Sequence, residues 1–176
     1  MRKVWTKRAS TVLLAVISVA IFAVGVWGCK TVTDYTAYRN EDFRAEVTGD
    51  LYGVPFSAVI EAENGGKELS VSYLSSDPLE GIVVALHADG TATVTREEVV
   101  IVCEKSAVSG LLSPVLLLFD TGDIGAVRKE GERTRLSFAG GGEMLLSSDM
   151  HPMRVDHGDV LYEVVWWEIT ENAQTG

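Results

Sequence analysis

Residues 43–51 read FRAEVTGDL, with apolar residues or glycine at every odd position and polar residues between them. Because successive side chains on a strand point to opposite faces, this alternation predicts a strand with one buried and one exposed face. A turn at Tyr52-Gly53 and a second alternating stretch over residues 54–60 follow. Two strands joined this closely predict an antiparallel hairpin.

Further short stretches rich in β-branched residues follow this hairpin, separated by turn signals such as Asp89-Gly90. Strands are predicted at 69–73, 82–86, 91–95, 98–103, 124–128, 134–138, 143–147, 153–156 and 161–169. A twisted antiparallel sheet of about ten strands does not stay open and flat, so we expect it to curl. Consecutive apolar residues at Val83-Val84 and at 99–102 predict that both faces of the sheet are covered.

The segment 106–122 interrupts the alternation and is apolar on all sides. Ser113-Pro114 suits a helix N-cap and first helical position, and Gly122 suits the end of a helix. The sequence therefore predicts a short buried helix near residues 113–120 that fills the concave side of the sheet. The predicted fold class is mainly β: a curled antiparallel sheet, or unclosed β-barrel, with that helical segment on its concave side.

The first 28 residues have the order of an export signal: a basic start over residues 1–8 and then a 20-residue run without charge. The end of this run and the residue after it, Val26-Trp27-Gly28-Cys29, resemble the lipobox of bacterial lipoproteins. The resemblance implies that Cys29 receives a lipid and becomes the mature N-terminus, although Trp27 stands where that pattern has a small residue. The alternative is an uncleaved signal anchor, because about 20 apolar residues can span a bilayer. Both interpretations place the remaining chain outside the cytoplasm, and the first attaches it to the membrane through Cys29.

From residue 29 onward the chain carries eleven basic and 25 acidic residues, a formal charge of −14. This balance repels phosphate backbones and anionic headgroups, which argues against nucleic-acid binding and against electrostatic membrane docking. The length suits one folded domain. We expect a signal peptide over 1–28, a lipidated tether over 29–42, a domain over 43–170 and a polar tail over 171–176.

The strongest polar cluster lies at residues 149–159, which contain His151 and His157. Two histidines six residues apart on one strand, sharing a face with Met153 and Val155, lie about 20 Å apart, too far to bind one metal ion. A strand flanked by turns is the simpler interpretation. Ser113 lies in no Gly-x-Ser-x-Gly elbow. The sequence thus predicts a protein that is not an enzyme and has no cofactor or metal site. A metal-dependent enzyme using His151 and His157 is a third alternative, which would need the chain to fold back between them.

Cys103 is expected to be a small buried residue in a strand, without an intrachain disulfide partner if Cys29 carries the lipid. Trp166 and Trp167 are expected on opposite faces of the last strand, one in the core and the other at a rim or ligand face.

Three stretches are similar to the LolA, LolB and LppX group of envelope lipoproteins and lipoprotein carriers: residues 43–49 leading into a hairpin, LSVSY at 69–73 followed by PLEG at 78–81, and DMHP at 149–152. That group folds as an unclosed β-barrel whose concave face holds acyl chains. The resemblance implies a carrier or sensor of lipids or other hydrophobic ligands, which is a fold-level analogy. The candidate apolar lining is Leu112, Val115, Leu116, Leu117, Phe119 and Trp166.

This chain departs from the group in having one substantial helical segment where the group has several. The alternative function is an envelope interaction or structural lipoprotein whose concave face is permanently filled by its own helix, with no small-molecule ligand. The two functions differ in whether an apolar cavity remains beside that helix. No protein partner is predicted from the sequence.

Overall fold

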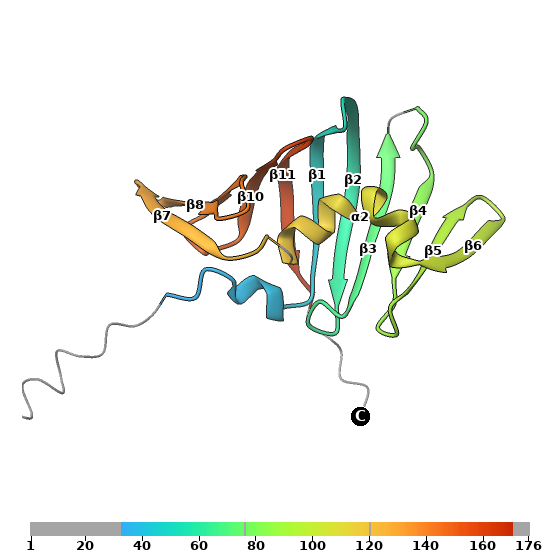
Figure 1. The fold of residues 1–176 in the computed structure, drawn as a ribbon, viewed down its shortest axis with the longest axis horizontal. Helices are drawn as coiled ribbons and strands as arrows, with labels where there is room; N and C mark the ends of the chain where they lie inside the picture. The colour runs from blue at the N-terminus through green and yellow to red at the C-terminus, as the bar shows by residue number, and fades with distance from the viewer. Residues whose placement is uncertain (1–32, 76, 120, 171–176) are drawn as a thin grey trace, which may run out of the picture. The chain divides into compact units, whose positions relative to one another are not determined.

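The computed structural model describes residues 33–75, 77–119 and 121–170. They form one eleven-stranded antiparallel sheet, one 3₁₀ helix and one α-helix, which confirms the predicted fold class (Figure 1). The strands are β1 (Phe43–Leu51), β2 (Val54–Glu63), β3 (Glu68–Ser75), β4 (Ile82–Leu86), β5 (Thr91–Arg96), β6 (Val99–Glu104), β7 (Ile124–Glu130), β8 (Arg133–Phe138), β9 (Glu143–Leu146), β10 (Pro152–His157) and β11 (Val160–Ile169). The predicted signal peptide over 1–28, the lipidation site Cys29 and the tail over 171–176 lie outside the described residues.

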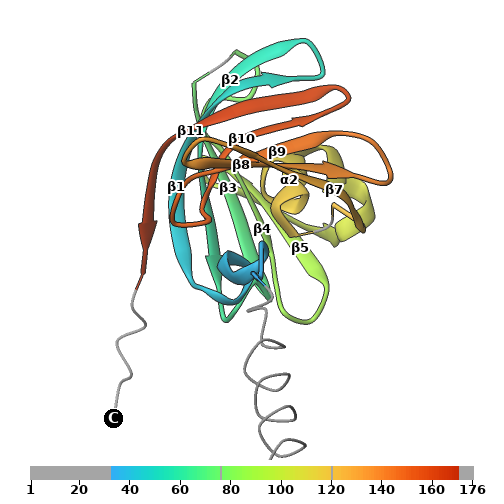
Figure 2. The same cartoon turned by 90° about the vertical axis from the view of Figure 1, so that its left-hand side faces the viewer.

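The strand order is β6-β5-β4-β3-β2-β1-β11-β10-β9-β8-β7, so the first and last strands pair in the middle of the sheet. The helix α2 (Lys105–Phe119) connects the two edge strands, β6 and β7. It crosses the sheet on the inside of its curve, as Figure 2 shows. Within the described part of the chain, residues 35–170 belong to one compact unit.

The core lies between the concave face of the sheet and α2. On β1 the burial alternates as the sequence predicted, with Phe43, Ala45 and Val47 buried. The helix adds Leu112, Val115 and Leu118, which are all fully buried. The predicted filling of the concave side by a helix is therefore confirmed.

The helix begins eight residues before the predicted start, and Pro114 lies inside it instead of at its first turn. Proline has no N–H, so it cannot donate to the carbonyl of Gly110 four residues earlier. The hydroxyl of Ser113 donates to that carbonyl instead, at 2.7 Å. This replacement bond explains why the helix continues through a Ser-Pro pair that resembles a helix start.

The predicted tether over 29–42 is too long at its C-terminal end. Residues Ala37–Asn40 form the 3₁₀ helix η1, and the Tyr38 side chain within it is buried. The Tyr38 hydroxyl and Arg39 Nε both donate to the carbonyl of Leu118, at 2.7 and 2.8 Å. Arg39 Nη2 also donates to Thr121 Oγ1 at 2.7 Å. This segment therefore caps the C-terminal end of α2, where unpaired carbonyls and the helix dipole favour a cation.

The prediction that both faces of the sheet are covered is wrong at its edge. Val99, Val100, Ile101 and Val102 on β6 are 55–68% exposed. On β4, Val84 is buried but Val83 is 38% exposed. The helix lies over the middle of the sheet (Figure 1), so the consecutive apolar residues of β6 extend beyond its cover.

Irregular pairing changes which side chains reach the core on the last strands. The register between β1 and β11 shifts between Glu46 and Val47, which leaves Val165 as an extra residue. As a result Trp167 turns to the core, where its ring stacks on Phe43 with centroids 4.1 Å apart. Trp166 pairs with Glu46 on the other face and is 43% exposed. The prediction that the two tryptophans lie on opposite faces is confirmed.

A second register shift, between Pro152 and Arg154, affects the histidine cluster. Pro152 and Val155 are both buried although they are three residues apart. Simple alternation, which placed His151, Met153, Val155 and His157 on one face, is therefore broken here. An extra residue at a bulge turns the following side chains to the opposite face.

Candidate ligand-binding cavity

Three tyrosine hydroxyls attach α2 to the rest of the fold. Tyr73 on β3 donates to the carbonyl of Leu111 at 2.7 Å, and Tyr162 on β11 donates to that of Pro114 at 2.6 Å. Tyr38 donates to the carbonyl of Leu118 at 2.7 Å. Burial raises the pKa of all three hydroxyls above the ordinary value of 10.0. These bonds fix the part of the helix that follows Gly110.

The N-terminal part of α2 is held differently, because Ser106, Ala107 and Ser109 are exposed and only Val108 is buried. Beside it lies a cavity of about 300 Å³, between the helix, the β1–β2 turn and the loop that follows β3. The lining residues are Leu51, Tyr52, Val54, Pro78, Leu79, Ala107, Val108, Gly110 and Leu111. Its volume lies at the lower end of the range for ligand sites, about 300–1,000 Å³.

The lining is almost wholly apolar, and the phenol of Tyr52 is the single side-chain polar group among these nine residues. Such a surface can bury hydrocarbon but offers no charge or amide to hold a polar headgroup. A ligand that suits it has a slim apolar part inside the cavity and its polar end in solvent.

Tyr52 lies at the mouth of the cavity and is 58% exposed. Its backbone has φ 55°, and its N–H donates to the carbonyl of Asp159 at 2.7 Å. The next residue is also fixed, because the Gly53 N–H donates to Asp50 Oδ1 at 2.6 Å. The phenol oxygen lies 3.4 Å from Ser113 Oγ. A fixed turn therefore places the aromatic ring against the N-terminal half of α2.

The six predicted lining residues do not line this cavity. Leu112 and Val115 are fully buried between α2 and the sheet. Leu116, Leu117 and Phe119 are partly buried and pack on the same core. Trp166 lies on the opposite face of the sheet, as its pairing with Glu46 shows.

The helix residues that do line the cavity precede the predicted helix start at Ser113, so sequence reasoning missed them. A helical signal was nevertheless present in the sequence. Val108, Leu112, Val115 and Leu118 are spaced four, three and three residues apart, which is the spacing of one buried helix face. That spacing places the start of the helix well before Pro114.

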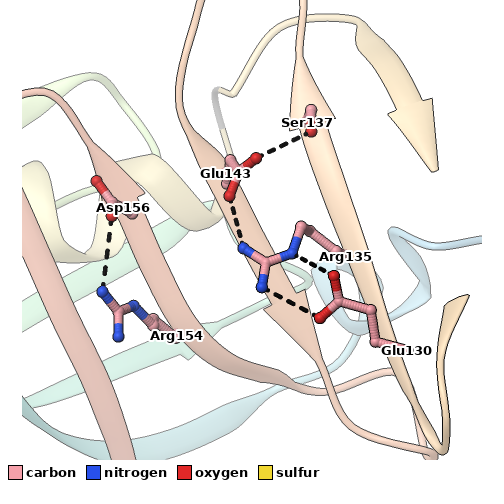
Figure 3. Close-up of polar contacts among 6 residues, drawn as sticks. All are labelled: Glu130, Arg135, Ser137, Glu143, Arg154 and Asp156. Atoms are coloured by element: carbon pink, nitrogen blue, oxygen red, sulfur yellow. Dashed lines mark hydrogen bonds and ion pairs between the residues drawn. The ribbon is translucent and has the colours of Figure 1, made fainter. Parts of the chain in front are cut away.

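A charged cluster lies apart from this cavity, on strands β7 to β10 (Figure 3). Arg135 donates to both carboxylate oxygens of Glu130, at 2.8 and 3.1 Å, and to Glu143 at 2.6 Å. The bonds from Arg135 hold the pKa of the Glu130 carboxyl below its ordinary value. Arg154 lies 3.7 Å from Asp156. These exposed charges are paired with one another, which is the ordinary arrangement of a solvated sheet surface.

The histidine cluster does not converge in the structure. His151 stacks on Trp167 with centroids 5.4 Å apart, and its Nε2 lies 3.6 Å from Glu41 Oε2. Within residues 33–75, 77–119 and 121–170, no three His, Cys, Asp or Glu side chains are grouped as metal ligands. Cys103 is partly buried and has a free thiol. No helix in this part of the chain is long and apolar enough to cross a membrane.

Comparison with known proteins supports the fold alone. No protein-family model matches the chain, and no curated protein matches it. Among solved structures, the chain is similar to an uncharacterised conserved protein from Thermus thermophilus, with a TM-score of 0.53 and 14% sequence identity. The likeness covers 78% of this chain and 85% of that one. The curled sheet with its crossing helix is thus an arrangement that another protein also adopts.

Proposed function

We propose that this chain is a non-catalytic lipoprotein outside the cytoplasm, anchored to a membrane through Cys29, that binds an acyl chain or a similarly slim apolar ligand. The observation that carries the proposal is the apolar cavity of about 300 Å³ beside the N-terminal half of α2. Apolar concave sites of this size are the usual form of small-molecule sites. The lining favours hydrocarbon because it lacks charged groups.

The anchor is proposed from the sequence order of basic start, apolar run and Gly28-Cys29. Cys29→Ser is expected to leave an uncleaved precursor, which intact mass measurement of the membrane fraction would detect. Cleavage at another position, or a wild-type chain without cleavage and acyl groups, would support the signal anchor instead.

Ligand binding is tested with a chain that lacks the first 29 residues, after circular dichroism has shown that its sheet is intact. Among the described residues, those of the buried core lie at or beyond Tyr38, so the shortened chain keeps all of them. A fluorescent fatty-acid analogue should bind saturably and be displaced by an unlabelled medium-chain fatty acid. Lipid extraction and mass spectrometry of the same preparation would show whether it retains a ligand from the cell.

Variants separate the cavity from non-specific uptake. Val108→Phe adds volume at a buried lining position and should weaken binding about tenfold or more. Val83→Phe adds the same side chain on a partly exposed strand position outside the lining and should leave binding unchanged. Equal losses from both variants, or no saturable binding by the wild type, would contradict the cavity as the binding site.

The second candidate function is an interaction or structural lipoprotein without a ligand. It is favoured by the full burial of Leu112, Val115 and Leu118, since this part of α2 already fills the concave side of the sheet. A folded chain that takes up no acyl probe and yields no extracted lipid would favour this second function.

A further inference from the structure

The edge strand β6 has an unusual surface. Four consecutive apolar residues, Val99 to Val102, are 55–68% exposed on both faces of the strand. The strand pairs with β5 on one side and is the last strand of the sheet on the other. Figure 1 shows the β5–β6 hairpin at one end of the sheet, away from the middle that α2 covers. Exposed apolar strands with a free edge are templates for pairing with another strand.

The free edge of β6 presents unpaired backbone groups at alternate residues. Arg96 and Val99 close a two-residue turn between β5 and β6, and such a closing pair is hydrogen-bonded. The backbone groups of Val99, Ile101 and Cys103 therefore turn towards β5. Those of Val100 and Val102 turn outward, where they can bond another strand.

The opposite edge of the sheet is built differently. On β7 the exposed residues include Arg128, Lys129 and Glu130, and the pairing with β8 shifts register between Ile124 and Ala126. Charged side chains and bulges are the usual protection of an edge strand against pairing. In β6 the run from Val99 to Cys103 contains no charge, proline or glycine. Each molecule thus offers one unprotected edge.

We propose that β6 is an interface between two copies of this chain, which pair antiparallel along this edge. One unprotected edge per molecule suits a closed two-fold dimer, because pairing uses up the edge in both copies and cannot continue into a filament. Directly opposed residues of two antiparallel strands point to the same face, whereas successive residues of one strand point to opposite faces. A two-fold axis between the two copies therefore places one residue opposite its own copy. Ile101 is the centre of the apolar run.

With Ile101 at the centre, the apolar run of one copy lies opposite the same run of the other copy. It places Val100 opposite Val102 of the second copy and Val99 opposite Cys103, so every opposed pair in the run is apolar. Just beyond the run, Glu98 of one copy comes opposite Glu104 of the other at both ends, and these like charges confine the favourable pairing to residues 99–103. Ile101 opposes Ile101 of the second copy at a non-hydrogen-bonded position, where Cα atoms lie about 4.5 Å apart.

The test uses the full chain in its native membrane, with Cys103→Ser as the background. Ile101→Cys should then form a disulfide between two copies on mild oxidation, because a Cα separation of about 4.5 Å lies within the range that a disulfide spans. Val165→Cys provides the control, since Val165 is 62% exposed at a bulge on β11 in the middle of the sheet. Any link through Cys29 would be common to both variants.

We expect a covalent dimer from Ile101→Cys and little from Val165→Cys. Adding Val100→Lys should suppress the link, because it places a charge in the apolar pairing, whereas adding Val127→Lys on β7 should not. Similar yields from the two cysteine positions, a link that survives Val100→Lys, or a product containing a different protein would overturn the proposal. A chain that stays monomeric with Ile101→Cys would also overturn it.

Discussion

The hydroxyl of Tyr162 donates a hydrogen bond to the carbonyl oxygen of Pro114 across 2.6 Å. Tyr162 is fully buried on β11, and Pro114 lies in the middle of α2. A helix interrupted by proline loses one backbone bond and some rigidity at that turn. The tyrosine bond holds that turn against the centre of the sheet, next to the part of the helix that lines the cavity.

Tyr162→Phe removes this bond while keeping the aromatic ring. We expect the free energy of unfolding to fall by about 1–2 kcal/mol, the usual effect of losing a buried hydrogen bond. Urea titration followed by circular dichroism measures the change. Tyr52→Phe is the matched control. The Tyr52 side chain is 58% exposed, so removing its hydroxyl group should change the free energy of unfolding little. Equal effects of the two variants would contradict the structural role of the Tyr162 bond.

The buried tyrosines also predict how stability depends on pH. Burial raises the pKa of Tyr38, Tyr73 and Tyr162 above 10.0 in the folded state, so the folded state keeps these protons more strongly than the unfolded chain. The resulting stability is fully present below pH 10 and is lost as the pH rises above that value. Urea titrations between pH 8 and 11 should show a falling free energy of unfolding above about pH 10. The double variant Tyr73→Phe/Tyr162→Phe should show a shallower fall.

The core beneath α2 can be compared with its flank by shortening two leucines of the same helix. Leu112→Ala should lower the free energy of unfolding by about 2–5 kcal/mol, because it leaves a cavity at a fully buried position. Leu117 is only partly buried, so Leu117→Ala should lower the free energy of unfolding by clearly less. Urea titrations of the two variants under the same conditions measure both changes. A larger cost for Leu117→Ala would mean that the helix faces the sheet with a different side.

Much of the sheet could be predicted because its signals are local. The alternation over residues 43–51 and the turns at Asp89-Gly90 and Tyr52-Gly53 each depend on neighbouring residues, and all lie where the sequence places them. The helix start was predicted wrongly because Ser113-Pro114 satisfies the local rule for a helix N-terminus. The helix continues through Pro114 with a local bond from Ser113 Oγ to the Gly110 carbonyl and a tertiary bond from Tyr162 to the Pro114 carbonyl.

The cavity and the edge could not be predicted, because both depend on distant segments meeting. Tyr52, Leu79 and Val108 come together only once the sheet has curled around α2. The run at 99–102 has the composition of a strand buried on both faces, but its position in the sheet order leaves it at the edge. The composition of a strand indicates whether it suits a buried environment, whereas its position in the sheet order decides which elements cover it.

Gly49 on β1 pairs with Tyr162 on β11 in the middle of the sheet. A Cβ atom at this position would overlap the carbonyl oxygen of Leu161 and lie 2.5 Å from Tyr162 Cα. Both contacts are with backbone, which cannot move aside without breaking the central strand pair. Gly49→Ala should therefore lower the free energy of unfolding by about 3 kcal/mol or more, among the largest effects of single substitutions. Gly140→Ala, where a Cβ meets nothing within 4 Å, should change it little in the same urea titration.

Gly110 lies on the part of α2 that lines the cavity. A Cβ there would come no closer than 3.8 Å, to Tyr52 Cε2, which is ordinary contact. Because glycine weakens a helix interior relative to alanine, Gly110→Ala should raise the free energy of unfolding by about 0.5–1 kcal/mol. The added methyl group narrows the cavity mouth beside the Tyr52 ring, so the same variant should bind a fluorescent fatty-acid analogue more weakly. Stability and affinity would then change in opposite directions, whereas Gly140→Ala should change neither. If Gly110→Ala stabilised the fold without weakening binding, the ligand would have to enter away from Tyr52.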